Sequence, residues 1–344
     1  MSIPGKKINL LYFSVFFLFF TSLFNLNSTA QKLNSSDSSI YLADPAMIQS
    51  NGIFYLYGTV GGNANNGFTA YSSNDMIHWK QASKTESGYT LEKGKAFGTA
   101  GFWAPQVFPF GNEFYMAYVA NENIAIAKSN HPAGPFTQKL LQPLSAPVKQ
   151  IDPFVFIDDD GKIYLYHVRL TNGNKIFVAE MEADFSEIKP ATLTECITAT
   201  APWENTANSQ WPVTEGPSVL KHKGIYYLFY TANDFRNPDY AVGYATSKSP
   251  YGPWKKYTGN PIISKSLVGI NGTGHGDFIK LKNDHLKYVF HTHFSDTTVS
   301  PRRTAIIDVK FVKGGKNNID KLVIDKKSFR FLQKAMIEKS TTNN

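Results

Sequence analysis

Apolar and polar residues follow one another in short runs separated by turns along most of the chain, a pattern typical of β-strands. Five segments share one arrangement: an apolar run, a polar turn with Gly or Asn-Asp, and a second run rich in Tyr, Phe, Leu and Val. They are DPAMIQSNGIFYLYGT from Asp44, APQVFPFGNEFYMAYVA from Ala104, DPFVFIDDDGKIYLYHV from Asp152, GPSVLKHKGIYYLFYTA from Gly216 and GDFIKLKNDHLKYVFHTH from Gly276. Each segment predicts a β-hairpin.

The hairpins recur about 48 to 64 residues apart, which leaves room for two more strands after each. A second repeated piece fills this room: a strand, a polar turn and then a large apolar residue, at Trp79, Phe136, Ile188 and Trp254. A hairpin followed by this piece makes a four-stranded sheet, the blade of a β-propeller. The sequence therefore predicts an all-β fold, a single-domain five-bladed β-propeller.

The remaining segments fit this prediction. No stretch shows sustained helical periodicity, and the strand patterns after Ile306 are expected to complete a blade or to close the ring. A β-sandwich is the alternative fold, but a sandwich needs no fivefold repetition.

Residues 1–30 differ from the rest of the chain. Lys6 and Lys7 precede an uncharged apolar run, and small residues follow at Ser28, Thr29 and Ala30. This order predicts a secretory signal peptide, with an uncleaved membrane anchor as the alternative. The expected mature protein, residues 31–344, is one catalytic propeller domain, secreted or periplasmic, with no membrane contact after cleavage.

Composition narrows the function classes. The net charge of +8 falls to about +6 without the signal peptide, and the lysines are scattered, which argues against a nucleic-acid partner. Cys196 is the only cysteine, so no internal disulfide can form. Aromatic residues make up 14% of the chain, a share that suits the stacking of rings against sugar faces.

The repeats differ in sequence at the start of each hairpin, and acidic residues occur at or beside three of these starts. The first hairpin begins at Asp44 and the third at Asp152, Glu215 lies one position before the start of the fourth, and the second begins at Ala104. Because the first strands of all blades line one central channel, these three carboxylates are expected to meet at its mouth. A single Asp-Pro is more often a plain turn, so the equivalent placement of the three acids carries the prediction.

Carboxylates held close together push each other's pKa values apart. Hydrolysis of a glycosidic bond uses such a difference, because one carboxyl must donate a proton while another, ionised, activates water or attacks carbon. The sequence thus favours a glycoside hydrolase over a noncatalytic glycan-binding propeller, which has no need of three acids at the channel mouth.

Five short motifs occur in order at the blade spacing: ADPA at 43–46, FWAPQV at 102–107, IDPF at 151–154, TEGP at 214–217 and GTGHGDF at 272–278. Together they resemble glycoside hydrolase family 43, and the resemblance covers essentially all of residues 31–344. It implies a five-bladed propeller that cleaves arabinosyl, xylosyl or galactosyl linkages with inversion at the anomeric carbon. Fructan-cleaving propellers, which retain configuration, fit less well because Ala43 and Ile151 stand where they carry Asn and Arg.

The resemblance also implies roles for the three acids. Asp44 matches the general base, Glu215 the general acid, and Asp152 the carboxylate that orients the acid and tunes its pKa. Inversion requires space for a water molecule, so the carboxyl groups of Asp44 and Glu215 are expected roughly 6.5 to 9.5 Å apart.

Further residues are candidates for the site. Trp103 precedes the second repeat and is expected either to stack on a sugar or to pack in the core, and Phe102 and Phe154 are weaker candidates for pocket walls. Trp79 and Trp254 lie in the outer repeat and are expected to be structural.

Two further residues are assigned through the resemblance. It places His275 on the propeller axis, either beside a structural Ca²⁺ or as a hydrogen-bonded core histidine. It also places Arg303, or its neighbour Arg302, near the acids, where a guanidinium would keep Asp152 ionised.

The expected substrate is a plant cell-wall carbohydrate, and the expected enzyme is an α-L-arabinofuranosidase that acts as a monomer and needs no cofactor for its chemistry. Other expected activities are those of a β-xylosidase or of a galactan-active or galactofuranose-releasing hydrolase. The β-sandwich domain found in many xylosidase members is not expected here, which favours arabinofuranosidase activity.

Overall fold

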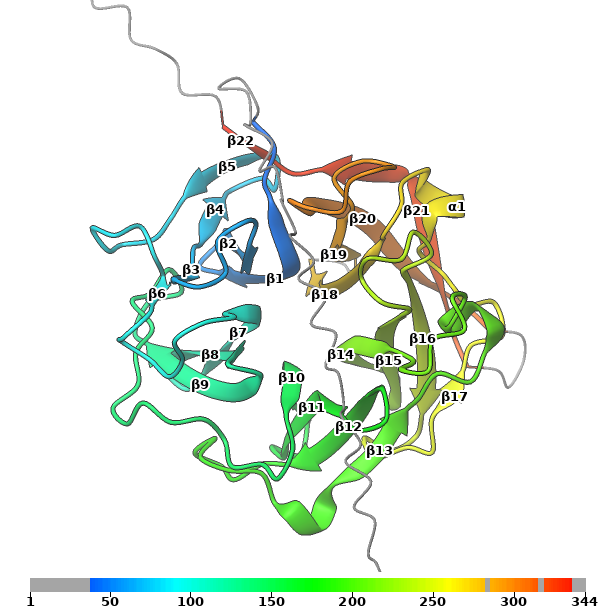
Figure 1. Ribbon diagram of the computed structural model, residues 1–344, viewed down its shortest axis with the longest axis horizontal. Helices are drawn as coiled ribbons and strands as arrows, with labels where there is room; N and C mark the ends of the chain where they lie inside the picture. Colours follow the sequence, from blue (N-terminus) through cyan, green and yellow to red (C-terminus); the bar gives the residue numbers. More distant parts are fainter. Residues whose placement is uncertain (1–37, 282–284, 315–318, 336–344) are drawn as a thin grey trace, which may run out of the picture. The chain divides into compact units, whose positions relative to one another are not determined.

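The five predicted hairpins form the innermost strands of five antiparallel sheets, arranged around one centre (Figure 1). The structure is a computed structural model that describes residues 38–281, 285–314 and 319–335. These residues belong to one compact unit, Ser36–Asn344, folded as a five-bladed β-propeller. The predicted signal peptide, residues 1–30, lies outside the described residues.

Each blade runs from the centre outward in chain order. Blade one contains β1 (Leu42–Ser50), β2 (Ile53–Val60), β4 (Tyr71–Ser73) and β5 (His78–Gln81), and blade two contains β7 (Trp103–Phe110), β8 (Glu113–Ala120) and β9 (Asn123–Ser129). Blade three contains β10 (Gln150–Ile157), β11 (Ile163–Leu170), β12 (Asn174–Glu180) and β13 (Thr194–Ile197). Blade four contains β14 (Thr214–His222), β15 (Ile225–Ala232), β16 (Ala241–Ser247) and β17 (Lys255–Lys256), and blade five contains β18 (Gly274–Lys280), β19 (Leu286–Thr292), β20 (Arg303–Val312) and β21 (Lys321–Phe331).

Short elements connect or close the blades. They are β3 (Gly67–Phe68), β6 (Leu91–Glu92), β22 (Gln333–Lys334), α1 (Lys265–Val268) and two 3₁₀ turns, Pro190–Thr192 and Pro202–Glu204. No helix in the described part of the chain has the length and apolar character needed to cross a membrane.

The prediction of four strands in every blade is wrong for blade two. Its fourth strand is reduced to a single bridge between Lys128 and Thr137, within the described residues. The segment after the bridge contains Pro143 and Pro147, and proline cannot donate to a strand ladder.

The predicted roles of the segments after Ile306 are both confirmed. Strand β21 completes blade five, and β22 pairs in parallel with β5 of blade one, which closes the ring. Hydrogen bonds from the Ile40 N–H to the Leu332 carbonyl and from the Leu332 N–H to the Thr304 carbonyl, both 3.0 Å, strengthen this closure.

The apolar core is divided into five clusters, one between each pair of neighbouring blades. Alternation along the strands explains this division, because successive side chains of a strand point to opposite faces. In β15, for example, Leu228 packs toward blade three and Phe229 toward blade five. Trp79 is fully buried between blades one and five, and Trp254 packs between blades three and four, so both are structural as predicted.

Every innermost strand carries a bulge near its start, where the pairing register shifts. At each bulge one residue has a positive φ, and these residues are Asp44 (49°), Ala104 (46°), Asp152 (55°), Gly216 (58°) and His275 (40°). A bulge re-aims the side chains around it. The repeated bulge therefore places equivalent residues of all five blades at one end of the central channel.

Candidate active site

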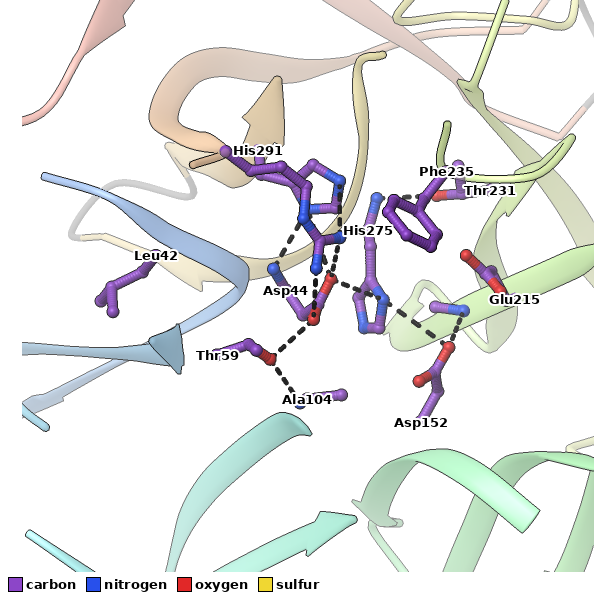
Figure 2. A network of polar contacts seen from close by, with 12 residues as sticks. Leu42, Asp44, Thr59, Ala104, Asp152, Glu215, Thr231, Phe235, His275 and His291 are labelled. Atoms are coloured by element: carbon purple, nitrogen blue, oxygen red, sulfur yellow. Dashed lines mark hydrogen bonds and ion pairs between the residues drawn. The ribbon is translucent and has the colours of Figure 1, made fainter. Parts of the chain in front are cut away.

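A cavity of about 450 Å³ lies where the innermost strands begin. Asp44 of blade one, Asp152 of blade three and Glu215 of blade four all line it. The structure thus brings together the three acids that the repeat pattern selected. Figure 2 shows His275 lying between Asp44 on one side and Asp152 and Glu215 on the other.

Asp44 is held by cationic and hydroxyl donors. Arg302 Nη1 donates to its Oδ1 at 2.9 Å, and the Thr59 hydroxyl donates to its Oδ2 at 2.7 Å. Burial alone would raise the pKa of Asp44, but the charge of Arg302, further interactions with His275 and His291, and the Thr59 hydrogen bond outweigh it. The pKa of Asp44 therefore lies well below its usual range, and the carboxyl is ionised.

Asp152 holds the backbone beside Glu215. Its Oδ2 accepts a hydrogen bond of 3.0 Å from the Gly216 N–H, the peptide group that follows Glu215. Burial and the charge of Asp44 raise the pKa of Asp152 to about 7, against the opposing effects of the Gly216 N–H and Arg302. Arg302 lowers the pKa of Asp152, as expected of a nearby guanidinium, but its hydrogen bond goes to Asp44, and burial and the charge of Asp44 outweigh its effect on Asp152.

Both carboxyl oxygens of Glu215 accept hydrogen bonds. The Tyr240 hydroxyl donates to Oε1 at 2.8 Å, and Asn174 Nδ2 donates to Oε2 at 3.0 Å. Burial and the charge of Asp152 raise the pKa of Glu215 to about 8. One acid of the cavity is thus protonated near neutral pH while Asp44 is ionised, the combination that acid–base hydrolysis needs.

His275 lines the cavity and lies between the acids of blades one and three. Its Nδ1 is 3.5 Å from Asp44 Oδ1 and 3.6 Å from Asp152 Oδ2, and its backbone N–H donates to the Thr231 hydroxyl at 2.9 Å. Burial lowers the pKa of the imidazole. Within the described residues, no group of three or more His, Cys, Asp or Glu side chains has the arrangement of a metal site, so a Ca²⁺ ion at His275 stays a prediction.

Arg302 faces the cavity, and Arg303 does not. The guanidinium of Arg303 lies 3.4 Å from the centre of the Phe331 ring, and Arg303 is not among the residues that line the cavity. Of the two arginines that the resemblance left open, Arg303 was named first as a substrate-binding residue, and this is wrong, because Arg302 lines the cavity and Arg303 does not.

Aromatic rings stand at the cavity wall. Trp103 is 36% exposed and Trp211 is 47% exposed, and both line the cavity with Phe235. Phe102 and Phe154 were expected as pocket walls, and this is wrong. Phe102 is fully buried against Phe68 and Tyr118, and Phe154 packs against the core between blades three and four.

Several residues around the acids carry no signal in the repeats. Asn174 begins β12, Tyr240 and Phe235 lie in the loop before β16, and His291 is the last residue but one of β19. His291 Nδ1 accepts the Asp44 N–H at 3.0 Å, and its ring stacks on Tyr240. For Trp211, its position four residues before Glu215 in the sequence is a signal that could have placed it at the cavity wall.

Comparison with known proteins identifies the family of the chain. The family model for glycosyl hydrolases family 43 matches residues 38–316. The chain is 24% identical to the beta-D-galactofuranosidase of Aspergillus niger over 78% of each chain. It is 28% identical to the arabinoxylan arabinofuranohydrolase of Bacillus subtilis, over 62% of this chain and 48% of that protein.

Solved structures show the same architecture. An endo-1,4-beta-xylanase from Bacteroides thetaiotaomicron is 42% identical, with a TM-score of 0.75, over 83% of this chain and 95% of that one. A thermostable family-43 glycoside hydrolase is 34% identical, with a TM-score of 0.74, over 85% of this chain and 96% of that one.

Proposed function

The chain belongs to glycosyl hydrolases family 43, whose members hydrolyse O-glycosyl bonds with inversion, and we propose that it releases α-L-arabinofuranose from plant cell-wall glycans. The three acids around one cavity, with one carboxyl protonated and one ionised near neutral pH, carry this proposal. A propeller that only binds glycans would gain nothing from burying these charges.

In the proposed reaction Asp44 is the general base. Its carboxylate takes a proton from water as the water attacks the anomeric carbon, and Arg302 keeps it ionised. Glu215 is the general acid, which protonates the oxygen of the departing sugar. Asp152 positions Glu215 through the Gly216 N–H, and its charge raises the pKa of the acid.

The substrate assignment rests on the family and on the relatives. The arabinoxylan arabinofuranohydrolase supports an arabinofuranoside, and Trp103, Trp211 and Phe235 provide faces for sugar stacking. The second candidate is a xylan linkage, because the relative with 42% identity is an endo-1,4-beta-xylanase. A galactofuranoside is the third, since the galactofuranosidase matches over 78% of both chains.

A panel of 4-nitrophenyl glycosides tests the sugar, with α-L-arabinofuranoside, β-D-xyloside and β-D-galactofuranoside compared at equal enzyme concentration. The arabinofuranoside is expected to have the highest kcat/KM. Proton NMR of the first-formed product is expected to show the inverted anomer. A higher kcat/KM on another glycoside would transfer the assignment to that sugar, and a retained anomer would contradict the mechanism.

We also propose that the protein is exported and acts outside the cytoplasm as a monomer. The charged and apolar pattern of residues 1–30 supports export. Size-exclusion chromatography with light scattering of residues 31–344 measures the molar mass in solution, which is expected to be that of one chain.

A further inference from the structure

Trp211 connects the rim of the cavity with the carboxyl of Glu215. It lies in the loop before β14, is 47% exposed and lines the cavity. Its indole Nε1–H donates a hydrogen bond of 2.9 Å to Asn174 Oδ1. This hydrogen bond restrains the exposed indole, so its ring can bind a ligand with little further loss of side-chain entropy.

Asn174 has only one orientation that satisfies its contacts. Because its Oδ1 accepts from Trp211, its Nδ2 faces Glu215 and donates to Oε2 at 3.0 Å. An amide nitrogen cannot accept, so this contact always donates toward the carboxyl. Trp211 thereby determines which end of the amide meets Glu215.

The backbone makes the same connection. The Asn174 N–H donates to the Pro212 carbonyl at 2.9 Å, and the Thr214 hydroxyl donates to the Asn174 carbonyl at 3.1 Å. The Trp211 loop and the first residue of β12 are therefore joined by two further hydrogen bonds.

The geometry of inversion places the departing sugar on this side. The acid and the base of an inverting hydrolase lie on opposite faces of the bond that breaks, and the acid faces the leaving group. Glu215 lies across His275 from Asp44 (Figure 2), and Trp211 is joined to Glu215 by one intervening side chain.

We propose that Trp211 is the platform for the leaving-group sugar and that, through Asn174, it positions the Glu215 carboxyl for proton donation. This inference rests on the proposed function and adds to it a positioning residue and a leaving-group subsite. A sugar stacked on the indole restrains Trp211, which in turn restrains the amide and the acid.

Two substrates of the preferred sugar separate this role from a merely structural one. The first carries a 2,4-dinitrophenyl group, which leaves without protonation, and the second carries a sugar as leaving group, which requires it. Trp211→Phe keeps an aromatic ring but loses the N–H, and Asn174→Ala loses the donor to Glu215. Each variant is expected to lose at least about tenfold more kcat/KM on the sugar-leaving substrate, within the range that general acid catalysis supplies.

Two readouts add detail. In Asn174→Ala the alkaline limb of the pH profile is expected to move to higher pH, because the lost N–H favoured the charged carboxyl. Trp211→Ala is expected also to raise KM for the sugar-leaving substrate about tenfold, since it removes the stacking face.

Trp254→Phe is the matched control, since this tryptophan packs between blades three and four, away from the cavity. Its ratio of activities on the two substrates is expected to equal that of the wild type. If the wild type is active and Trp211→Phe and Asn174→Ala keep its ratio and alkaline limb, the inference is overturned while the proposed function stands. A wild type inactive on every glycoside would overturn both.

Discussion

At the scale of single residues, two adjacent arginines have unrelated environments. Arg302 donates to Asp44, whereas Arg303 stacks on Phe331. Asp44 depends on the guanidinium because burial alone would raise its pKa. The neighbouring pair therefore provides a variant and its control.

We predict that Arg302→Met lowers kcat at least about 100-fold and moves the acid limb of the pH profile to higher pH, because Asp44 loses its cation. Arg303→Met is expected to keep kcat within about threefold, since its side chain does not reach the cavity. Steady-state kinetics from acid to neutral pH measures both. An unchanged acid limb in Arg302→Met would contradict the account of Asp44.

The protonation of Glu215 also affects stability. Its pKa rises from 4.5 to about 8 on folding, so the fold favours the protonated carboxyl. That contribution to the free energy of unfolding is fully present below the unfolded pKa and is lost as pH rises through the folded pKa. The wild type therefore loses stability across this window.

We predict that Glu215→Gln, which carries no charge, gains on the order of 4 kcal/mol of unfolding free energy relative to the wild type as the pH rises from about 5 to about 9. Urea denaturation at both pH values measures the change. A difference between the two proteins that stays constant with pH would show that Glu215 does not titrate as proposed.

Sequence alone located the three acids because Asp44 and Asp152 stand at equivalent positions of the repeats and Glu215 stands one position before the equivalent one. It did not locate Asn174 or Tyr240, which lie outside the repeated hairpins and reach Glu215 only after the blades assemble. The side chain of Phe102 is likewise buried in the core, although its neighbour Trp103 lines the cavity.

At the scale of elements, the bulge of each innermost strand aims residues into the cavity. Four of the five positive-φ positions carry a side chain, and the fifth is Gly216. A Cβ atom on Gly216 would come within 2.8 Å of the His275 ring. Glycine is thus required here by both a close approach and the backbone conformation.

We predict that Gly216→Ala costs about 2 kcal/mol of stability and lowers kcat at least tenfold, because the shift of His275 and of the Asp152 contact displaces Glu215. Ala104→Gly, at the equivalent bulge of blade two, is the control and is expected to change stability by less than about 1 kcal/mol. Thermal melts measure the stability of both variants, and steady-state kinetics measures their kcat. Equal losses in the two variants would contradict the claim that the contact with the His275 ring makes glycine necessary at position 216.

Alternation and turn chemistry were enough to predict the hairpins, because each is a local unit. The outer strand of blade two was not predictable in the same way. It forms a single bridge between Lys128 of β9 and Thr137, and the prolines that follow at positions 143 and 147 cannot donate to a strand ladder.

At the scale of the whole molecule, the ring is closed by residues far apart in sequence. Leu332, 1% exposed, packs in the cluster between blades five and one and exchanges backbone hydrogen bonds with Ile40 and Thr304. The site depends on this closure, because Arg302 of blade five must reach Asp44 of blade one.

We predict that Leu332→Ala lowers the unfolding free energy by about 3 kcal/mol, as expected for a buried leucine. Val323→Ala, in the exposed part of β21, is expected to cost less than about 1 kcal/mol. Chemical denaturation measures the unfolding free energy of both variants. Similar losses in the two variants would mean that the closing segment contributes little.

The central claim is that acids from blades one and four act as base and acid on one bond. The most direct measurement compares kcat of Asp44→Asn and Glu215→Gln on the two substrates that differ only in their leaving group, with melting curves to confirm the fold. Both variants are expected to lose at least about 1,000-fold on the sugar-leaving substrate, and Glu215→Gln alone is expected to recover most activity on the 2,4-dinitrophenyl glycoside. Wild-type turnover of the sugar-leaving substrate by either folded variant would contradict the claim.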